Sequence, residues 1–151
     1  MALDIAEIRR RAEEGNAYNE CALGLCYLYG VEIQVDYWRA FGLLFNASQK
    51  HVLRACLHLG FMYAHGWGTK RDLREAARLF ERVAAEDDGT DAFEACIALG
   101  RIYSGAIQSA SLPDVAAALQ WYAAAITMAP DSDGDEMNEA RAYLARYRRE
   151  G

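Results

Sequence analysis

The sequence predicts an all-α fold: a solenoid of about three helix–turn–helix repeats with a capping helix at each end. Three observations carry this prediction. A set of landmark residues recurs after 36 and then 40 residues, small residues are abundant, and only two prolines occur among 151 residues. A period of this length is typical of helical solenoids, because a single unit cannot bury its own apolar surface and must stack on its neighbours.

The clearest copy of the repeating unit lies at residues 53–80, and less perfect copies precede and follow it. Each copy carries a Leu-Gly pair, a tyrosine, a glycine and an aspartate at similar spacing. These are Leu23-Gly24, Tyr27, Gly30 and Asp36; Leu59-Gly60, Tyr63, Gly66 and Asp72; and Leu99-Gly100, Tyr103, Gly105 and Asp114. We therefore interpret residues 1–151 as one repeat domain, with an N-terminal cap helix at 1–15, repeats at 16–50, 51–88 and 89–129, and a C-terminal helix at 130–151.

The order of helices follows from the apolar periodicity and the residues that begin and end each run. An amphipathic helix at 4–14 should end at Gly15, which suits a left-handed C-cap. The later helices are expected at 17–29, 37–49, 52–65, 72–86, 91–104, 113–128 and 135–149. Asp72 and Glu75 are spaced as in a capping box, and Ser111 and Pro113 are expected to mark the start of the helix at 113–128.

Packing within a unit is predicted from the 100° turn per residue of an α-helix. Ala55, Leu59 and Tyr63 are four residues apart, so they share one face, which should meet the second helix of the same unit. Gly60, like Gly24 and Gly100, leaves room for close helix contact. In the loop that follows, Gly66 or Gly68 can adopt a positive φ at little cost and turn the chain back.

Composition and charge exclude several classes of function. The formal net charge of −6 argues against binding of nucleic acid, which needs clustered Lys and Arg. No apolar run approaches the roughly 20 residues of a membrane-spanning helix. The first 15 residues mix acids and arginines without an apolar stretch, so no signal peptide is predicted and a cytoplasmic location is expected. The four cysteines are then expected to be reduced, buried thiols.

Several repeat motifs together resemble the Sel-one-like repeat family, which is related to the tetratricopeptide repeats. They are Gly15-Asn16-Ala17, Leu-Gly-x-x-Tyr-x-x-Gly, the Gly-x-Gly at 66 and 68, Asp-x-x-x-Ala, and a closing Ala-x-x-Leu/Trp-Phe/Tyr. The resemblance covers nearly all of residues 15–129. It implies a right-handed α–α superhelix in which the first (A) helix of each repeat lines a concave surface that binds proteins or peptides.

Helical geometry also indicates which A-helix residues point away from the second helix and could bind a partner. Relative to the leucine of Leu-Gly, they occupy positions −5, −1, +2 and +6. Ala98 holds one of these positions, and the candidates are Tyr18, Ala22, Leu25, Tyr29, Arg54, His58, Phe61, His65, Glu94 and Arg101. Exposed aromatic residues near arginine are typical of binding hot spots. The alternative is that Leu25 and Phe61 simply pack against neighbouring helices.

Catalytic and metal-binding patterns are not convincing. His51, His58 and His65 are seven residues apart, whereas helical metal ligands are usually three or four apart. Asp131, Asp133 and Asp135 imitate the start of a calcium loop, but Glu136 and Ala142 stand where glycine and glutamate are required. A nucleophile–base pair of Cys26 and His58 has no support beyond their expected proximity. No catalytic residue, metal or cofactor is predicted.

We therefore expect a non-catalytic adaptor that binds a protein or peptide partner along its A helices. An alternative is an immunity or inhibitor protein that occludes a cognate toxin or enzyme, since an acidic surface would attract a basic partner. No nucleic acid or membrane insertion is expected, and the chain should be a monomer or a weak homodimer. The helix at 135–149 either caps the stack or offers its bare side to a second copy.

Overall fold

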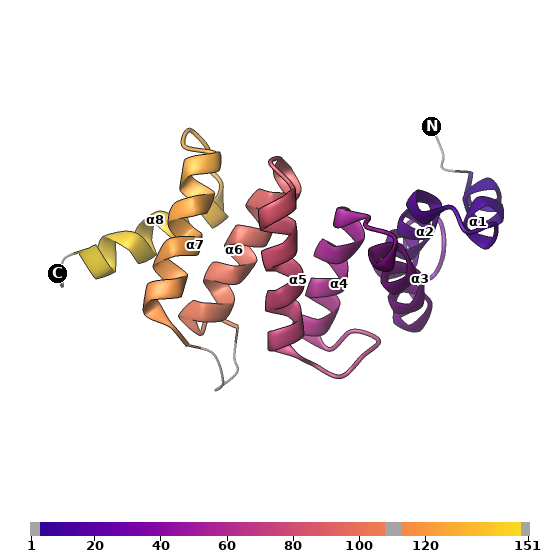
Figure 1. The fold of residues 1–151 in the computed structure, drawn as a ribbon, viewed down its shortest axis with the longest axis horizontal. Helices are drawn as coiled ribbons and strands as arrows, with labels where there is room; N and C mark the ends of the chain where they lie inside the picture. Colours follow the sequence, from indigo (N-terminus) through magenta and orange to yellow (C-terminus); the bar gives the residue numbers. More distant parts are fainter. Residues whose placement is uncertain (1–3, 108–112, 149–151) are drawn as a thin grey trace. The chain divides into compact units, whose positions relative to one another are not determined.

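The computed structural model describes residues 4–107 and 113–148, and the regular structure in those two ranges is entirely α-helical (Figure 1). The chain divides after Leu79 into two compact units, residues 1–79 and 80–151. The helices are α1 (Ile5–Glu13), α2 (Ala17–Tyr29), α3 (Tyr37–Gln49), α4 (Leu53–His65), α5 (Leu73–Glu86), α6 (Thr90–Ser104), α7 (Val115–Met128) and α8 (Asp135–Arg148).

Aspartate is the N-cap residue of α1, α3 and α7. The side chains of Asp4, Asp36 and Asp114 each accept a hydrogen bond from the amide three residues later, at 3.0 to 3.1 Å, which satisfies a donor that has no partner inside the helix. Pro113 therefore does not start α7, contrary to our expectation, because Asp114 is the N-cap; Ser111 lies outside the described residues.

The capping box predicted at Asp72 is only half formed. Asp72 accepts from the amides of Arg74 and Glu75 at 3.1 and 3.0 Å. The Glu75 side chain, however, pairs with Arg78, and the Asp72 amide donates to the carbonyl of Tyr63 at 2.9 Å. The reciprocal hydrogen bond from the Asp72 amide to Glu75 is absent because this amide already donates to a carbonyl near the end of α4.

A left-handed glycine ends each A helix, as the sequence predicts for the second repeat. Gly30, Gly66 and Gly105 have φ values of 69°, 72° and 78°, and Gly68 adopts 67° in the loop after α4. The first repeat has Glu32 at the place of Gly68, 36 residues earlier, and Glu32 also takes a positive φ of 60°. The loop geometry is therefore kept even where the sequence lacks the glycine that makes it inexpensive.

In the first unit α2 packs against α3, and α3 against α4. Gly24 allows the first contact, because a Cβ there would lie 2.8 Å from Leu44 of α3. Tyr63 makes a contact that the sequence did not lead us to expect, because its ring meets Phe41 of the preceding repeat edge-on, with centroids 5.5 Å apart. The tyrosine of the A helix thus also joins one repeat to the next.

In the second unit α6 packs against α7 in the same way, and α8 follows on (Figure 1). A Cβ at Gly100 would lie 2.6 Å from the ring of Tyr122, so only glycine admits this contact. The core of the unit comprises Cys96, Ile97, Tyr122, Ala125 and Ala140. Cys96 belongs to it as a small apolar residue, and all four cysteines are buried thiols outside disulfides.

Candidate functional site

The A helices of the first unit, α2 and α4, enclose a shallow hollow of about 430 Å³. Four of its lining residues, Tyr18, Ala22, Leu25 and Arg54, are among the sequence-predicted partner-binding residues. Tyr18 is 78% exposed at one edge. The hollow therefore combines an apolar surface, an aromatic ring and a guanidinium group, which is a composition suited to a protein side chain.

A second group of predicted residues continues this face along α2 and α4. The hydroxyl of Tyr29 lies 2.8 Å from Nδ1 of His58, and the two rings meet edge-on at 5.6 Å. The ring of Phe61 lies 6.1 Å from that of His58. Tyr29 remains 53% exposed. Phe61 is half-buried, so part of its side chain packs within the protein and part is accessible to a partner.

His65, the last predicted residue of α4, lies in an aromatic stack. Its ring is nearly parallel to that of Trp67 at 4.3 Å, and Trp67 in turn stacks on Tyr37 at 5.7 Å. His65 also bonds through Nδ1 to the carbonyl of Phe61 at 2.9 Å. The stack holds the loop after α4 against the start of α3, so His65 has a structural role there.

The predicted residues of the second unit have different surroundings. Ala98, which shares their side of the helix in the sequence pattern, is buried at 3% exposure. Glu94 is half-buried. Arg101 binds Glu139 of α8 through two nitrogens, the shortest distance being 2.8 Å, and lies 3.6 Å from Glu136. Its guanidinium group therefore anchors α8 to α6.

The hydroxyl of Tyr122 completes that anchor, because it donates to Glu139 at 2.8 Å. Desolvation raises the pKa of Glu139, but the hydrogen bonds from Arg101 and Tyr122 outweigh it and leave the pKa below its ordinary value. Met137 and Ala140 of α8 are fully buried. One side of α8 therefore packs on α6 and α7.

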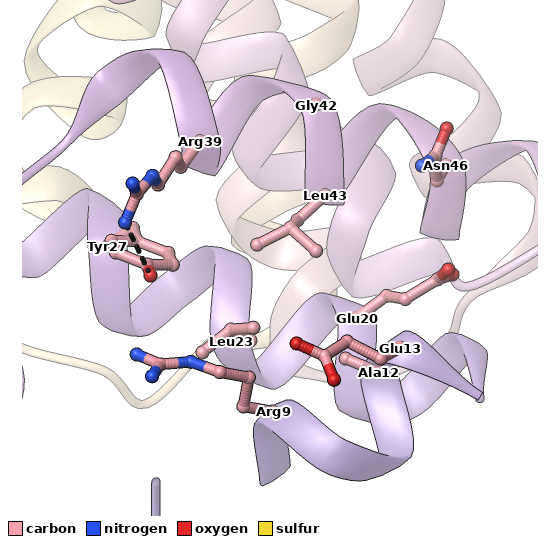
Figure 2. Close-up of a pocket in the computed structure, with 10 residues that line it drawn as sticks. All are labelled: Arg9, Ala12, Glu13, Glu20, Leu23, Tyr27, Arg39, Gly42, Leu43 and Asn46. Atoms are coloured by element: carbon pink, nitrogen blue, oxygen red, sulfur yellow. Dashed lines mark hydrogen bonds between the residues drawn. The ribbon is translucent and has the colours of Figure 1, made fainter. Parts of the chain in front are cut away.

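A larger hollow, which the sequence did not lead us to expect, lies between α1, α2 and α3. It has a volume of about 600 Å³, and we call it the α1–α3 trough (Figure 2). Ala12, Leu23 and Leu43 form its apolar floor, and Tyr27 and Arg39 close one end through a hydrogen bond of 3.2 Å.

One signal in the sequence could have pointed to this trough. Gly42 lines it from the middle of α3, and a Cβ there would meet no atom within 4 Å. The residues six positions after Asp72 and Asp114 are Arg78 and Gln120. Glycine in a helix interior lowers stability by about 1 kcal/mol relative to alanine. A glycine at a position where packing does not require it therefore indicates a surface that side chains leave uncovered.

Cys26, considered above as a nucleophile, is poorly suited to react. Cys26 is 4% exposed, and burial, followed by the carboxylate of Glu32, raises the pKa of its thiol. A protonated, buried thiol is a weak nucleophile. Among the described residues, no three His, Cys, Asp or Glu side chains gather as metal ligands would. None of the described helices is both long and apolar enough to cross a membrane.

Comparison with known families decides the classification. The model of the Sel1 repeat matches residues 20–50, 53–88 and 93–129. The chain belongs to the Sel1 repeat family. Proteins of this family are generally protein–protein interaction modules, and the resemblance and the all-α solenoid class predicted from the sequence are confirmed.

Two curated relatives share part of the Sel1 repeat region. HRD3A of Arabidopsis thaliana, described as an ERAD-associated E3 ubiquitin-protein ligase component, is 31% identical over 78 residues, which are 52% of this chain and 12% of that protein. Human protein sel-1 homolog 2 is 34% identical over 76 residues, 50% of this chain and 11% of that protein. The matches thus span about an eighth of the length of these relatives.

Solved structures of Sel1-like proteins share the fold. The protective antigen c5321 of uropathogenic Escherichia coli, which displays an SLR fold, superposes with a TM-score of 0.70 at 24% identity, covering 83% of this chain and 26% of that one. A Sel1 repeat protein from Oxalobacter formigenes gives 0.67 at 22% identity, covering 89% and 50%. At such low identity the likeness concerns the fold alone.

Proposed function

We propose that this Sel1 repeat chain is a non-catalytic interaction module that binds a segment of a protein partner on the α2–α4 face of its first unit. The observation that carries the proposal is the hollow beside Tyr18, where predicted residues from both A helices come together. Tyr18 is 78% exposed, so a partner that covers its ring buries much apolar surface. Such burial contributes about 25 cal/mol per Å² to the free energy of binding.

The chemistry of the face favours an apolar or aromatic side chain as the anchor of the bound segment. Ala22 and Leu25 supply apolar contact, and Tyr18 supplies a ring edge with a polar tip. Arg54 also lines the hollow, so the bound segment would lie beside a positive charge. Tyr29 and His58 extend the same surface along the helices.

Site-specific photocrosslinking in the native cell tests this proposal. A photoreactive phenylalanine derivative replaces Tyr18, and the matched control replaces Trp38, which is 80% exposed on α3 of the same unit. We expect a protein adduct from position 18 and none from position 38. An adduct only at position 38, or the same adduct at both positions, would contradict a site on α2 and α4.

Variants then test whether the crosslinked protein depends on the face. Tyr29→Ala combined with Phe61→Ala should weaken its binding at least tenfold while the helical circular dichroism is retained. Loss of the helical signal would mean that these residues belong to the core. If the captured protein is an enzyme or toxin and saturating amounts of the chain abolish its activity, the inhibitor alternative replaces the adaptor function.

A further inference from the structure

We infer that the α1–α3 trough is a second peptide site, which takes an extended segment of a partner protein in which a large apolar residue lies between an acidic and a basic residue. This site differs from the α2–α4 face, and neither site depends on the other. The inference rests on an unfilled position in α3, on the polarity of the trough and on its length.

The unfilled position is Gly42. A side chain there would extend over the mouth of the trough, and the second and third repeats carry Arg78 and Gln120 at the equivalent place. Because no neighbouring atom would obstruct a Cβ, the fold does not require glycine, and α3 is less stable for having it. Access to the apolar floor is what the glycine preserves.

The polarity of the trough gives the order of charges in its ligand. Figure 2 shows the guanidinium groups of Arg9 and Arg39 toward one end, and Glu20 and Asn46 toward the other, with Leu43 between them. Arg9 has no ion-pair partner among the described residues, whereas Arg39 is 3.5 Å from Asp36. Two neighbouring guanidinium groups of which one is unpaired favour a carboxylate ligand.

One carboxylate of the trough remains for a basic residue. Lys50 already neutralises Glu20, since its Nζ lies 2.9 and 2.8 Å from the two carboxylate oxygens. Glu13 has no such partner in the described part of the chain, and its carboxylate lies farther along the trough than the guanidinium group of Arg9, between the two ends (Figure 2). We therefore assign the acidic residue of the ligand to Arg9 and Arg39, and the basic residue to Glu13.

The length of the trough fits three residues. Its α3 wall runs from Arg39 to Asn46, which is about 10 Å at 1.5 Å per helical residue. An extended chain covers about 3.3 Å per residue, so the wall accommodates three residues, of which the central one points to Leu23 and Leu43.

The net charge of the first unit also permits an acidic ligand. This unit contains ten Lys and Arg residues and nine Asp and Glu residues, so the excess of negative charge lies in the second unit.

A displayed library of heptapeptides with random central residues, selected on the full chain, tests the inference. We expect enrichment of acid–apolar–base triplets for the unaltered chain. Gly42→Arg, which introduces the residue of the second repeat, should reduce that enrichment at least tenfold by covering the floor. Arg9→Ala should reduce it about tenfold by removing one charged hydrogen-bonding group, since tenfold corresponds to 1.4 kcal/mol.

Two controls make each outcome informative. Gln49→Arg adds the same side chain to α3 outside the trough and should leave the enrichment unchanged. Tyr18→Ala alters the α2–α4 face and should also leave it unchanged, so failure of this inference is distinguishable from failure of the proposed function. Enrichment that survives Gly42→Arg, or enriched triplets without the two charges, would overturn the inference. Because arginine favours helix more than glycine does, misfolding would not explain a loss.

Discussion

Replacing Gly68 by alanine is expected to destabilise the first unit by about 2–4 kcal/mol. Gly68 has a φ of 67°, and a Cβ there would lie 2.4 Å from the carbonyl oxygen of Tyr37 and 2.8 Å from its carbonyl carbon. Real Cβ atoms do not approach a backbone so closely, so either the loop after α4 or the start of α3 must move. The substitution therefore combines a strained backbone with a steric clash.

The two contributions can be separated with Gly66, which has a similar φ of 72° but whose added Cβ would make only ordinary contacts at 3.5 Å. A left-handed backbone costs an L-residue about 1–2 kcal/mol, and the lower entropy of unfolded alanine returns about 0.5–1 kcal/mol. Gly66→Ala should thus cost about 1 kcal/mol. Only Gly68→Ala carries the further 1–3 kcal/mol, roughly, of an overpacked contact.

Urea unfolding followed by tryptophan fluorescence measures this difference. Two of the three tryptophans, Trp38 and Trp67, lie in the first unit, so a Trp121→Phe background confines the signal to that unit. The free energies of unfolding of both glycine variants are compared with that background. Equal losses for Gly66→Ala and Gly68→Ala would refute the reasoning, because the approach of Tyr37 would then have no energetic consequence.

Three further predictions concern other parts of the chain. Glu32→Gly should stabilise the first unit by about 0.5–1 kcal/mol in the same assay, since it relieves a left-handed glutamate; Glu32→Ala keeps the Cβ, and an equal gain from it would contradict this cause. The hydrogen bonds that lower the pKa of Glu139 stabilise the second unit at pH values above 4.5, the ordinary pKa of this carboxyl group. This stability is lost as the pH falls through the lower pKa of the folded state. Glu139→Gln should therefore flatten the decline of stability in acid, measured by denaturation at pH 3 to 6, and an unchanged decline would show that other carboxylates cause it. Burial raises the pKa of Cys96 to about 11, so iodoacetamide at pH 8 should label it only after unfolding, as followed by mass spectrometry; rapid labelling of the native chain would show that the core opens.

Local features of the fold could be predicted because they are encoded within a few neighbouring residues. The helices of the first repeat begin and end at the expected residues, 17–29 and 37–49, because Asn16 and Asp36 cap their starts and Gly30 ends α2. The start of α7 was placed two residues early because Pro113 was given the role that Asp114 performs.

The candidate site was only partly predictable from the sequence. The repeat spacing predicts a shared side for Tyr18, Ala22, Leu25 and Arg54, and these residues line one hollow. The same spacing placed Ala98 on the binding side, although it is buried. Position along a helix gives the direction of a side chain, but it does not show which neighbouring element covers it.

By itself, the sequence determined the family, the all-α class and the residues that allow close helix contact, because each depends on spacing along one chain segment. Only the tertiary structure decided that Glu32 adopts the left-handed conformation of Gly68, that Tyr63 reaches Phe41 of the preceding repeat, and that α1 and α3 leave a trough over Leu23. These features join residues that are distant in sequence. The energies of these contacts depend on the shape of the space between helices, which a local sequence pattern does not specify.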